Sequence, residues 1–131
     1  MNKRVLKIFR QAKRMLNKQS QIKELIWKVS QKLKKINGSN KQINELLEHV
    51  QLFLRMIKKS LAGEYSAFSH KTLFSLVFGL LYFVTPMDVV PDFIPLLGFS
   101  DDLSIVYFII KNFKSDIEDF KGWELNRESV R

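Results

Sequence analysis

Apolar side chains recur in alternating steps of three and four residues through residues 5–36 of this chain. Ten positions make up the repeat, and nine of them are apolar while Gln19 is polar. None of the twelve Lys and Arg residues among the first 36 falls on it. This period predicts one amphipathic helix of about five heptads whose apolar seam packs against other helices. The ten positions are Val5, Ile8, Ala12, Met15, Gln19, Ile22, Ile26, Val29, Leu33 and Ile36.

A second amphipathic helix is predicted after a turn at residues 37–38, Asn-Gly. Glycine accepts the left-handed backbone that ends helices, and Ser39 with Gln42 has the spacing of a capping box. The apolar period then resumes, so we expect a helical hairpin over residues 3–61. In its seam, Gln19 either sets the register of the packed helices or reaches solvent at the end of a layer. The apolar positions of the second helix are Ile43, Leu46, Val50, Phe53 and Ile57.

The 131 residues, enough for one small domain, divide into a basic and an acidic half. Residues 1–60 carry 16 Lys and Arg against 3 Glu, whereas residues 61–131 carry 6 against 10 Asp and Glu. Such asymmetry indicates an anionic partner, either lipid head groups or nucleic acid. Anionic membrane lipids are favoured, because the basic helix has no helix-turn-helix or aromatic stacking pattern. No long apolar run follows the first charges, so we expect no secretory signal and a cytoplasmic basic half.

The period disappears in residues 73–84, where only two residues interrupt the apolar side chains. The apolar stretch, counted over residues 72–87, predicts a helix that is apolar on every side. Such a helix is either buried in protein or lies in lipid. Its 16 residues fall just short of the ~17–25 needed for a membrane span. Lys71 before it, and Lys111 and Lys114 further on, predict that both ends of an apolar hairpin face the cytoplasm.

All three prolines of the chain lie in residues 82–102, a segment rich in aspartate. A residue before proline avoids helical backbone, so the apolar helix should end at Thr85. Gly98 permits a reversal of the chain, and Ser100 or Asp101 is expected to cap a last helix that begins about one residue later. The segment therefore reads as a rigid corner between two apolar helices.

The corner has the pattern Y-x-x-x-P-x-D-x-x-P-D-F-I-P-x-x-G-x-x-D-D. Eleven positions carry it: Tyr82, Pro86, Asp88, Pro91, Asp92, Phe93, Ile94, Pro95, Gly98, Asp101 and Asp102. This pattern resembles the signature of the YkvA-like proteins, the domain of unknown function 1232, over about residues 70–110. The resemblance implies a small, mostly bacterial, helical and often membrane-associated protein with no established catalytic activity.

Two interpretations of Asp88, Asp92, Asp101 and Asp102 stay open. Each is placed to cap a helix or to form a turn, which is a common role of aspartate at helix starts. In the alternative interpretation, the four aspartates form a cation or proton site, because carboxylates flanked by Phe, Ile and Leu are costly to leave unpaired. Oxygen ligands would suit Ca²⁺ or Mg²⁺, although the spacing is not that of an EF-hand. The sequence leaves the metal unknown.

No catalytic constellation is evident. The chain has no Cys, which excludes thiol chemistry and thiolate zinc sites. Its two histidines, His49 and His70, lack a partner at metal-binding spacing, and no serine sits in a nucleophile-elbow motif. A glycine-rich phosphate loop is missing as well. We therefore expect that the chain has no catalytic residues, binds no cofactor and is not an enzyme.

These observations predict an all-α protein in three parts. They are a basic amphipathic helical hairpin at residues 1–65, an apolar YkvA-like helical hairpin with a Pro/Asp-rich corner at 66–121, and a polar tail at 122–131. We expect a non-enzymatic bacterial protein of the cell membrane, anchored by the apolar hairpin with the basic region at the anionic surface. The alternatives are a soluble helical adaptor for a protein partner and an immunity-type membrane protein. Nucleic acid is not expected as a partner, and the oligomeric state is unknown.

Overall fold

The computed structural model describes residues 3–36, 41–85 and 95–129 of the chain. This part folds into helices joined by short connections and contains no strand, which confirms the predicted all-α class. The helices are α1 (Lys3–Met15), α2 (Gln19–Lys35), α3 (Lys41–Leu61), α4 (His70–Val84), α5 (Pro95–Asn112) and α6 (Lys114–Ser129).

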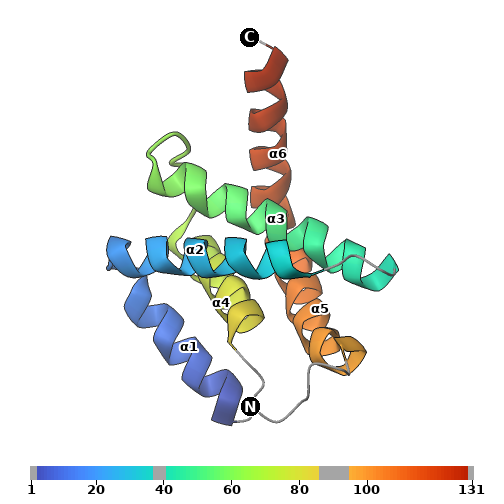
Figure 1. Cartoon of the computed structure of the whole chain (residues 1–131). Helices are drawn as coiled ribbons and strands as arrows, with labels where there is room; N and C mark the ends of the chain where they lie inside the picture. Colours follow the sequence, from blue (N-terminus) through green and yellow to red (C-terminus); the bar gives the residue numbers. More distant parts are fainter. Residues whose placement is uncertain (1–2, 37–40, 86–94, 130–131) are drawn as a thin grey trace.

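Helix α4 lies at the centre of the fold (Figure 1). It packs against α1, α2, α3 and α5. Leu76, Val77 and Leu80 on this helix are completely excluded from solvent. Burial against other helices therefore accounts for a helix that is apolar on every side. No described helix combines the length and the apolarity required to cross a membrane.

The first apolar repeat forms two helices, so the single helix predicted from the sequence is wrong. Helix α1 ends at Met15 and α2 begins at Gln19, with Lys18 in extended backbone conformation between them. A straight helix over residues 5–36 would be about 48 Å long, about twice the length of α4. The break allows both α1 and α2 to pack against α4. Asn17 favours a break here, because its short polar side chain competes for backbone hydrogen bonds.

The repeat itself is confirmed, because none of its nine apolar positions is exposed. Ala12 and Val29, for example, are fully buried. Gln19 is exposed at the first residue of α2, which confirms the interpretation that it reaches solvent. All five apolar positions predicted for the second helix are buried in α3. The predicted turn and capping box at residues 37–40 lie outside the described residues.

The connection between α3 and α4, residues 62–69, contributes two aromatic side chains to the core. Gly63 turns the chain with a φ of +76°, a conformation that favours glycine. Beyond it, Tyr65 and Phe68 are buried. Their rings pack against the ring of Phe120 in α6, with centroids 5.3 and 5.7 Å apart. This connection therefore helps to hold α6 against the rest of the fold.

Helix α5 begins earlier than the sequence predicted. It starts at Pro95, and Gly98 lies inside its first turn, so Gly98 does not reverse the chain. Proline is favoured at the first position of a helix, where its missing N–H has no intrahelical partner to lose. A glycine inside a helix costs only about 1 kcal/mol relative to alanine. After a short break α6 continues to Ser129, so most of the predicted polar tail at residues 122–131 is helical.

Candidate functional site

The structure describes the two ends of the Pro/Asp-rich segment. Tyr82 is buried in the last turns of α4. Ser100, Asp101 and Asp102 lie inside α5, so the prediction that Ser100 or Asp101 caps its start is wrong. The side chains of residues 95–103 are not described, so a cation or proton site at the aspartates stays a prediction. The motif residues outside the described part are Pro86, Asp88, Pro91, Asp92, Phe93 and Ile94.

The chain enters this segment from a helix end that other side chains hold in place. Thr85 has extended backbone conformation and ends α4, as predicted, and its hydroxyl donates to the Leu81 carbonyl over 2.6 Å. Lys32 of α2 donates to the Phe83 carbonyl, and its ammonium lies 4.4 Å from the centroid of the Phe83 ring. A cation is favourable at this place, because the negative end of the helix dipole faces it.

The other end of α4 is held by a partly buried polar network. The Ser69 hydroxyl accepts from the backbone N–H of Thr72 over 3.2 Å, which caps the helix. The two hydroxyls are 3.0 Å apart, and that of Thr72 also donates to the carboxylate of Asp116 at the start of α6. Thr72 is only 1% exposed. A carboxylate beside a helix N-terminus is electrostatically favoured, so this network joins α4 to α6.

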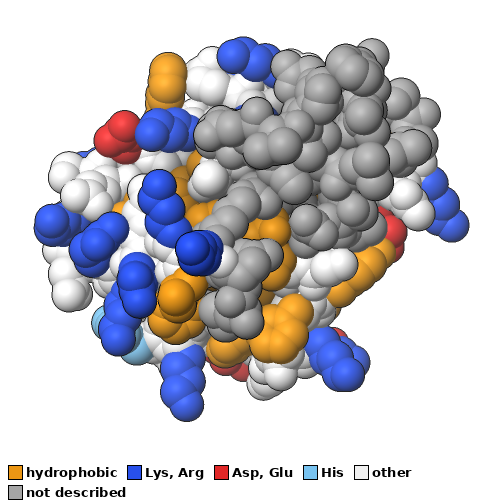
Figure 2. All heavy atoms as spheres, turned by 90° about the horizontal axis from the view of Figure 1, so that it is seen from below, with side chains coloured by type: hydrophobic (Ala, Val, Ile, Leu, Met, Phe, Trp, Pro, Cys, Tyr) orange, Lys and Arg blue, Asp and Glu red, His pale blue; other side chains and the backbone are white. Residues whose placement is uncertain are grey.

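Helix α1 presents dense positive charge to solvent. Six of its 13 residues are Lys or Arg and none is acidic. Lys3, Lys7 and Arg10 are exposed, and their spacing of four and three residues places them on one side of the helix. In Figure 2, Lys and Arg side chains gather over one half of the face seen from below, with apolar side chains among them.

Apolar side chains of α1 and α4 lie beside these charges. Leu6 and Phe9 of α1 are each 37% exposed. The ring of Phe9 meets those of Phe74 and Phe78 edge-on, with centroids 4.8 and 6.2 Å apart. Exposed apolar side chains flanked by Lys and Arg are typical of surfaces that meet lipid head groups. We call the set Lys3, Leu6, Lys7, Phe9 and Arg10 the α1 face.

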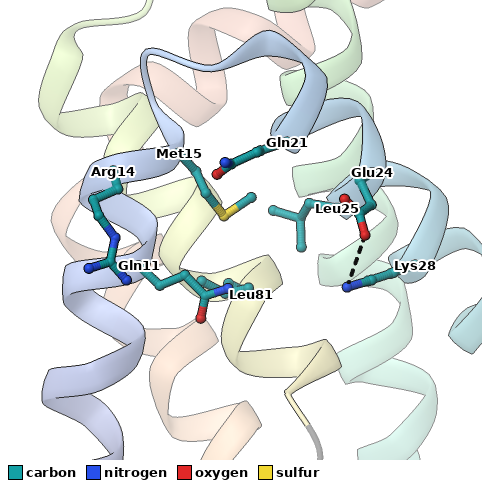
Figure 3. A pocket seen from close by; sticks show the side chains of 8 residues that line it. All are labelled: Gln11, Arg14, Met15, Gln21, Glu24, Leu25, Lys28 and Leu81. Atoms are coloured by element: carbon teal, nitrogen blue, oxygen red, sulfur yellow. Dashed lines mark ion pairs between the residues drawn. The ribbon is translucent and has the colours of Figure 1, made fainter.

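A polar cleft of about 390 Å³ opens between α1 and α2 (Figure 3). Its apolar lining is Met15, Leu25 and Leu81, the last from α4. In Figure 3 the Lys28 ammonium and the Gln11 amide point into the cleft from opposite walls. The Lys28 ammonium is 3.3 Å from the Glu24 carboxylate. The polar lining consists of Gln11, Arg14, Gln21, Glu24 and Lys28.

The two histidines lie on different helices. His49 on α3 is partly buried, and its ring centroid is 6.1 Å from that of Tyr107 on α5. Burial lowers the pKa of His49, against an opposing effect of the nearby Glu45 carboxylate. His70 is exposed at the first residue of α4. Within the described ranges, no group of three or more His, Asp and Glu side chains is arranged to hold a metal ion.

Sequence reasoning missed the functions of Lys32 and Asp116 and did not find the cleft. The position of Lys32 beside the seam residue Leu33 was the only signal that it borders the core. Asp116 lies 44 residues from its partner Thr72, too far for any local pattern to pair them. The cleft depends on the break between α1 and α2, which the unbroken heptad period concealed.

Comparison with known proteins covers more of the chain than the Pro/Asp-rich segment. A family described as "Protein of unknown function (DUF1232)" matches residues 72–108, from the first turn of α4 into α5. The "Uncharacterized membrane protein YkvA" of Bacillus subtilis (strain 168) is 32% identical over 85 residues, which is 65% of this chain and 80% of that protein. No solved structure matches the chain. The match to these sequences extends beyond the Pro/Asp-rich corner, and this chain belongs to the YkvA-like family of DUF1232 proteins.

Proposed function

We propose that this chain is a non-enzymatic protein that attaches to an anionic membrane surface, with its basic half on the cytoplasmic side. The observation that carries the proposal is the α1 face, in which exposed cations lie beside exposed Leu6 and Phe9. A surface of this kind combines electrostatic attraction to lipid head groups with burial of apolar side chains among them. The related Bacillus subtilis protein is named a membrane protein, which agrees with this attachment.

The attachment that we propose is to the surface, with helices α4 and α5 remaining in the protein. Helix α4 packs against α1, α2, α3 and α5, and its side chains Leu76, Val77 and Leu80 have no contact with solvent. For this helix to enter a bilayer, those contacts would have to break. The α1 face can meet lipid without any such change, because its side chains are already exposed.

The charges of the α1 face are sufficient for measurable binding. Each Lys or Arg near an anionic membrane contributes about 1 kcal/mol, so Lys3, Lys7 and Arg10 together contribute about 3 kcal/mol. Insertion of Leu6 and Phe9 adds a hydrophobic contribution that salt does not screen. We therefore expect binding that high salt weakens but does not abolish.

Sedimentation with lipid vesicles tests this proposal. The full chain should bind phosphatidylcholine vesicles that contain phosphatidylglycerol, and should bind pure phosphatidylcholine vesicles at least about tenfold more weakly. Replacement of Lys3, Lys7 and Arg10 by Gln should weaken binding to the anionic vesicles by at least about tenfold. The matched control replaces Lys111, Lys114 and Lys121 by Gln, three exposed lysines of α5 and α6.

Three results would contradict the proposal. Equal loss of binding in both triple variants would assign the effect to net charge alone and not to the α1 face. Failure of the wild-type chain to bind anionic vesicles would favour the soluble adaptor. Resistance of membrane-bound protein to alkaline carbonate extraction would instead favour insertion of the apolar hairpin.

A further inference from the structure

We propose that the cleft between α1 and α2 binds a phosphate ester that also carries hydroxyl groups, the chemistry of phosphoglycerol. Two sources offer this chemistry, the head group of phosphatidylglycerol and free glycerol phosphate. The lipid source rests on the proposed function, whereas the free ester does not. The cleft volume of about 390 Å³ lies within the ~300–1,000 Å³ typical of small-molecule sites.

The positive charges of the cleft predict that the ligand is an anion. Arg14 contributes from α1 and Lys28 from α2, so the two cations border the cleft from its two walls. Arg14 is exposed, and the ion pairs of the described residues do not include it. Its guanidinium can therefore contact a ligand. Guanidinium groups match the geometry of phosphate oxygens through paired N–H donors. Lys28 adds a second positive charge from the opposite wall of the cleft.

The remaining polar groups predict hydroxyl groups on the same ligand. Gln11 and Gln21 each offer an amide N–H₂ that donates and a carbonyl that accepts. The carboxylate of Glu24 only accepts hydrogen bonds, and it is held 3.3 Å from Lys28. A bare phosphate would leave these acceptors unused and would be repelled by Glu24. A glycerol moiety can donate its hydroxyls to Glu24 and to the two amides.

The spacing of the lining residues along the helices supports one continuous site. Gln11 and Arg14 are three residues apart on α1, and Gln21, Glu24 and Lys28 follow at steps of three and four on α2. Residues at these steps lie on one side of a helix. The apolar lining of Met15, Leu25 and Leu81 would lie under the glycerol carbons.

Titration of the full chain, followed by NMR chemical shifts, tests this inference with two probes. One probe is dioctanoylphosphatidylglycerol below its micelle concentration, and the other is glycerol 3-phosphate. The cleft variant combines Arg14→Gln with Lys28→Gln. The matched control combines Lys13→Gln with Lys23→Gln, which removes one exposed cation from each of the same helices outside the cleft.

Binding of either probe should shift the resonances of the cleft lining, and the cleft variant should weaken it at least about tenfold, while the control stays within about twofold. Binding of the lipid alone would identify the head group as the source, and comparable binding of both probes would identify the free ester. Replacement of Glu24 by Gln should strengthen binding of the phosphate but weaken the preference for glycerol phosphate over inorganic phosphate.

The inference is overturned if neither probe shifts the cleft resonances, or if the cleft and control variants lose affinity equally. These outcomes leave the surface attachment intact, because that is measured with vesicles and depends on Lys3, Lys7 and Arg10. Conversely, if the chain fails to bind vesicles but binds glycerol 3-phosphate through Arg14 and Lys28, the cleft site is supported and the membrane attachment is contradicted.

Discussion

Single polar side chains from distant parts of the chain fix both ends of helix α4. Lys32 reaches the Phe83 carbonyl at one end, and Asp116 accepts from the buried Thr72 hydroxyl at the other. Each interaction places a charge where the helix dipole favours it, a cation at the C-terminus and an anion at the N-terminus. These two residues therefore join the ends of α4 to α2 and α6.

His49 should make the stability of the protein depend on pH. Burial lowers the pKa of His49 in the folded chain below the ordinary value of 6.5, and nearby Lys121 acts in the same direction. The unfolded chain therefore takes up a proton more readily as the pH falls through ~6.5. The stability that neutral His49 contributes to the folded chain is fully present above that pH and is lost progressively below it. We expect His49→Gln to reduce the fall in melting temperature between about pH 7.5 and about pH 5.5.

The matched variant is His70→Gln, because His70 is exposed at the start of α4. It should retain the pH dependence of the wild-type melting temperature. An unchanged pH dependence in His49→Gln would show that other groups cause it. Hydrogen bonds from Arg127 and Lys59 lower the pKa of Glu64. Glu64 therefore affects the melting temperature only at more acidic pH, below about 4.5.

At the scale of helices, the crossing of α4 with α3 and α5 depends on a small residue. A Cβ at Gly79 would lie 2.8 Å from Cδ1 of Ile109 in α5 and 3.7 Å from the Phe53 ring in α3. Alanine there requires only that the flexible end of Ile109 moves. A larger side chain would overpack this crossing, because the three helices meet around it.

We therefore expect Gly79→Leu to lower the free energy of unfolding by at least about 2 kcal/mol. The matched variant is Gly122→Leu in α6, where nothing lies within 4 Å of an added Cβ. That change should stabilise the protein by up to about 1 kcal/mol, because glycine is a poor helix former. Urea denaturation measures both effects. Equal stability of the two variants would mean that α4 and α5 can separate at little cost.

At the scale of the whole molecule, one hydrophobic core includes side chains from both halves of the sequence. Buried Leu46 of α3 and Leu80 of α4 belong to the same cluster, which also contains Phe120 of α6. Such a shared core predicts that residues 1–65 and 66–121 unfold together. Thermal unfolding should then give one transition, with the same midpoint for helix content and for the fluorescence of Trp123.

Leu46→Ala and Leu80→Ala test this cooperativity. Each should lower the same single transition, with a loss of about 2–5 kcal/mol. Trp27→Phe should accompany both changes, so that fluorescence reports Trp123 in its aromatic cluster with Tyr65 and Phe120. Two transitions, of which Leu46→Ala moves only one, would establish the halves as separate domains.

The amino-acid sequence determined the helical class, the buried faces of the helices and the end of α4. The heptad period identified every apolar seam residue correctly, because the burial of a helix face depends on local spacing alone. Thr85 ended α4 as expected, since the following proline acts directly on its backbone. The signature of residues 82–102 likewise identified the family from spacing within a single segment.

Only the tertiary structure decided where the helices break and which residues meet. The spacing of the seam continues through residues 15–22 with only Gln19 polar, yet the helix ends at Met15, and both short helices pack against α4. The cleft between Arg14 and Lys28 exists only because of that break. Contacts such as that of Thr72 with Asp116 join residues far apart in the chain, and local spacing carries no information about them.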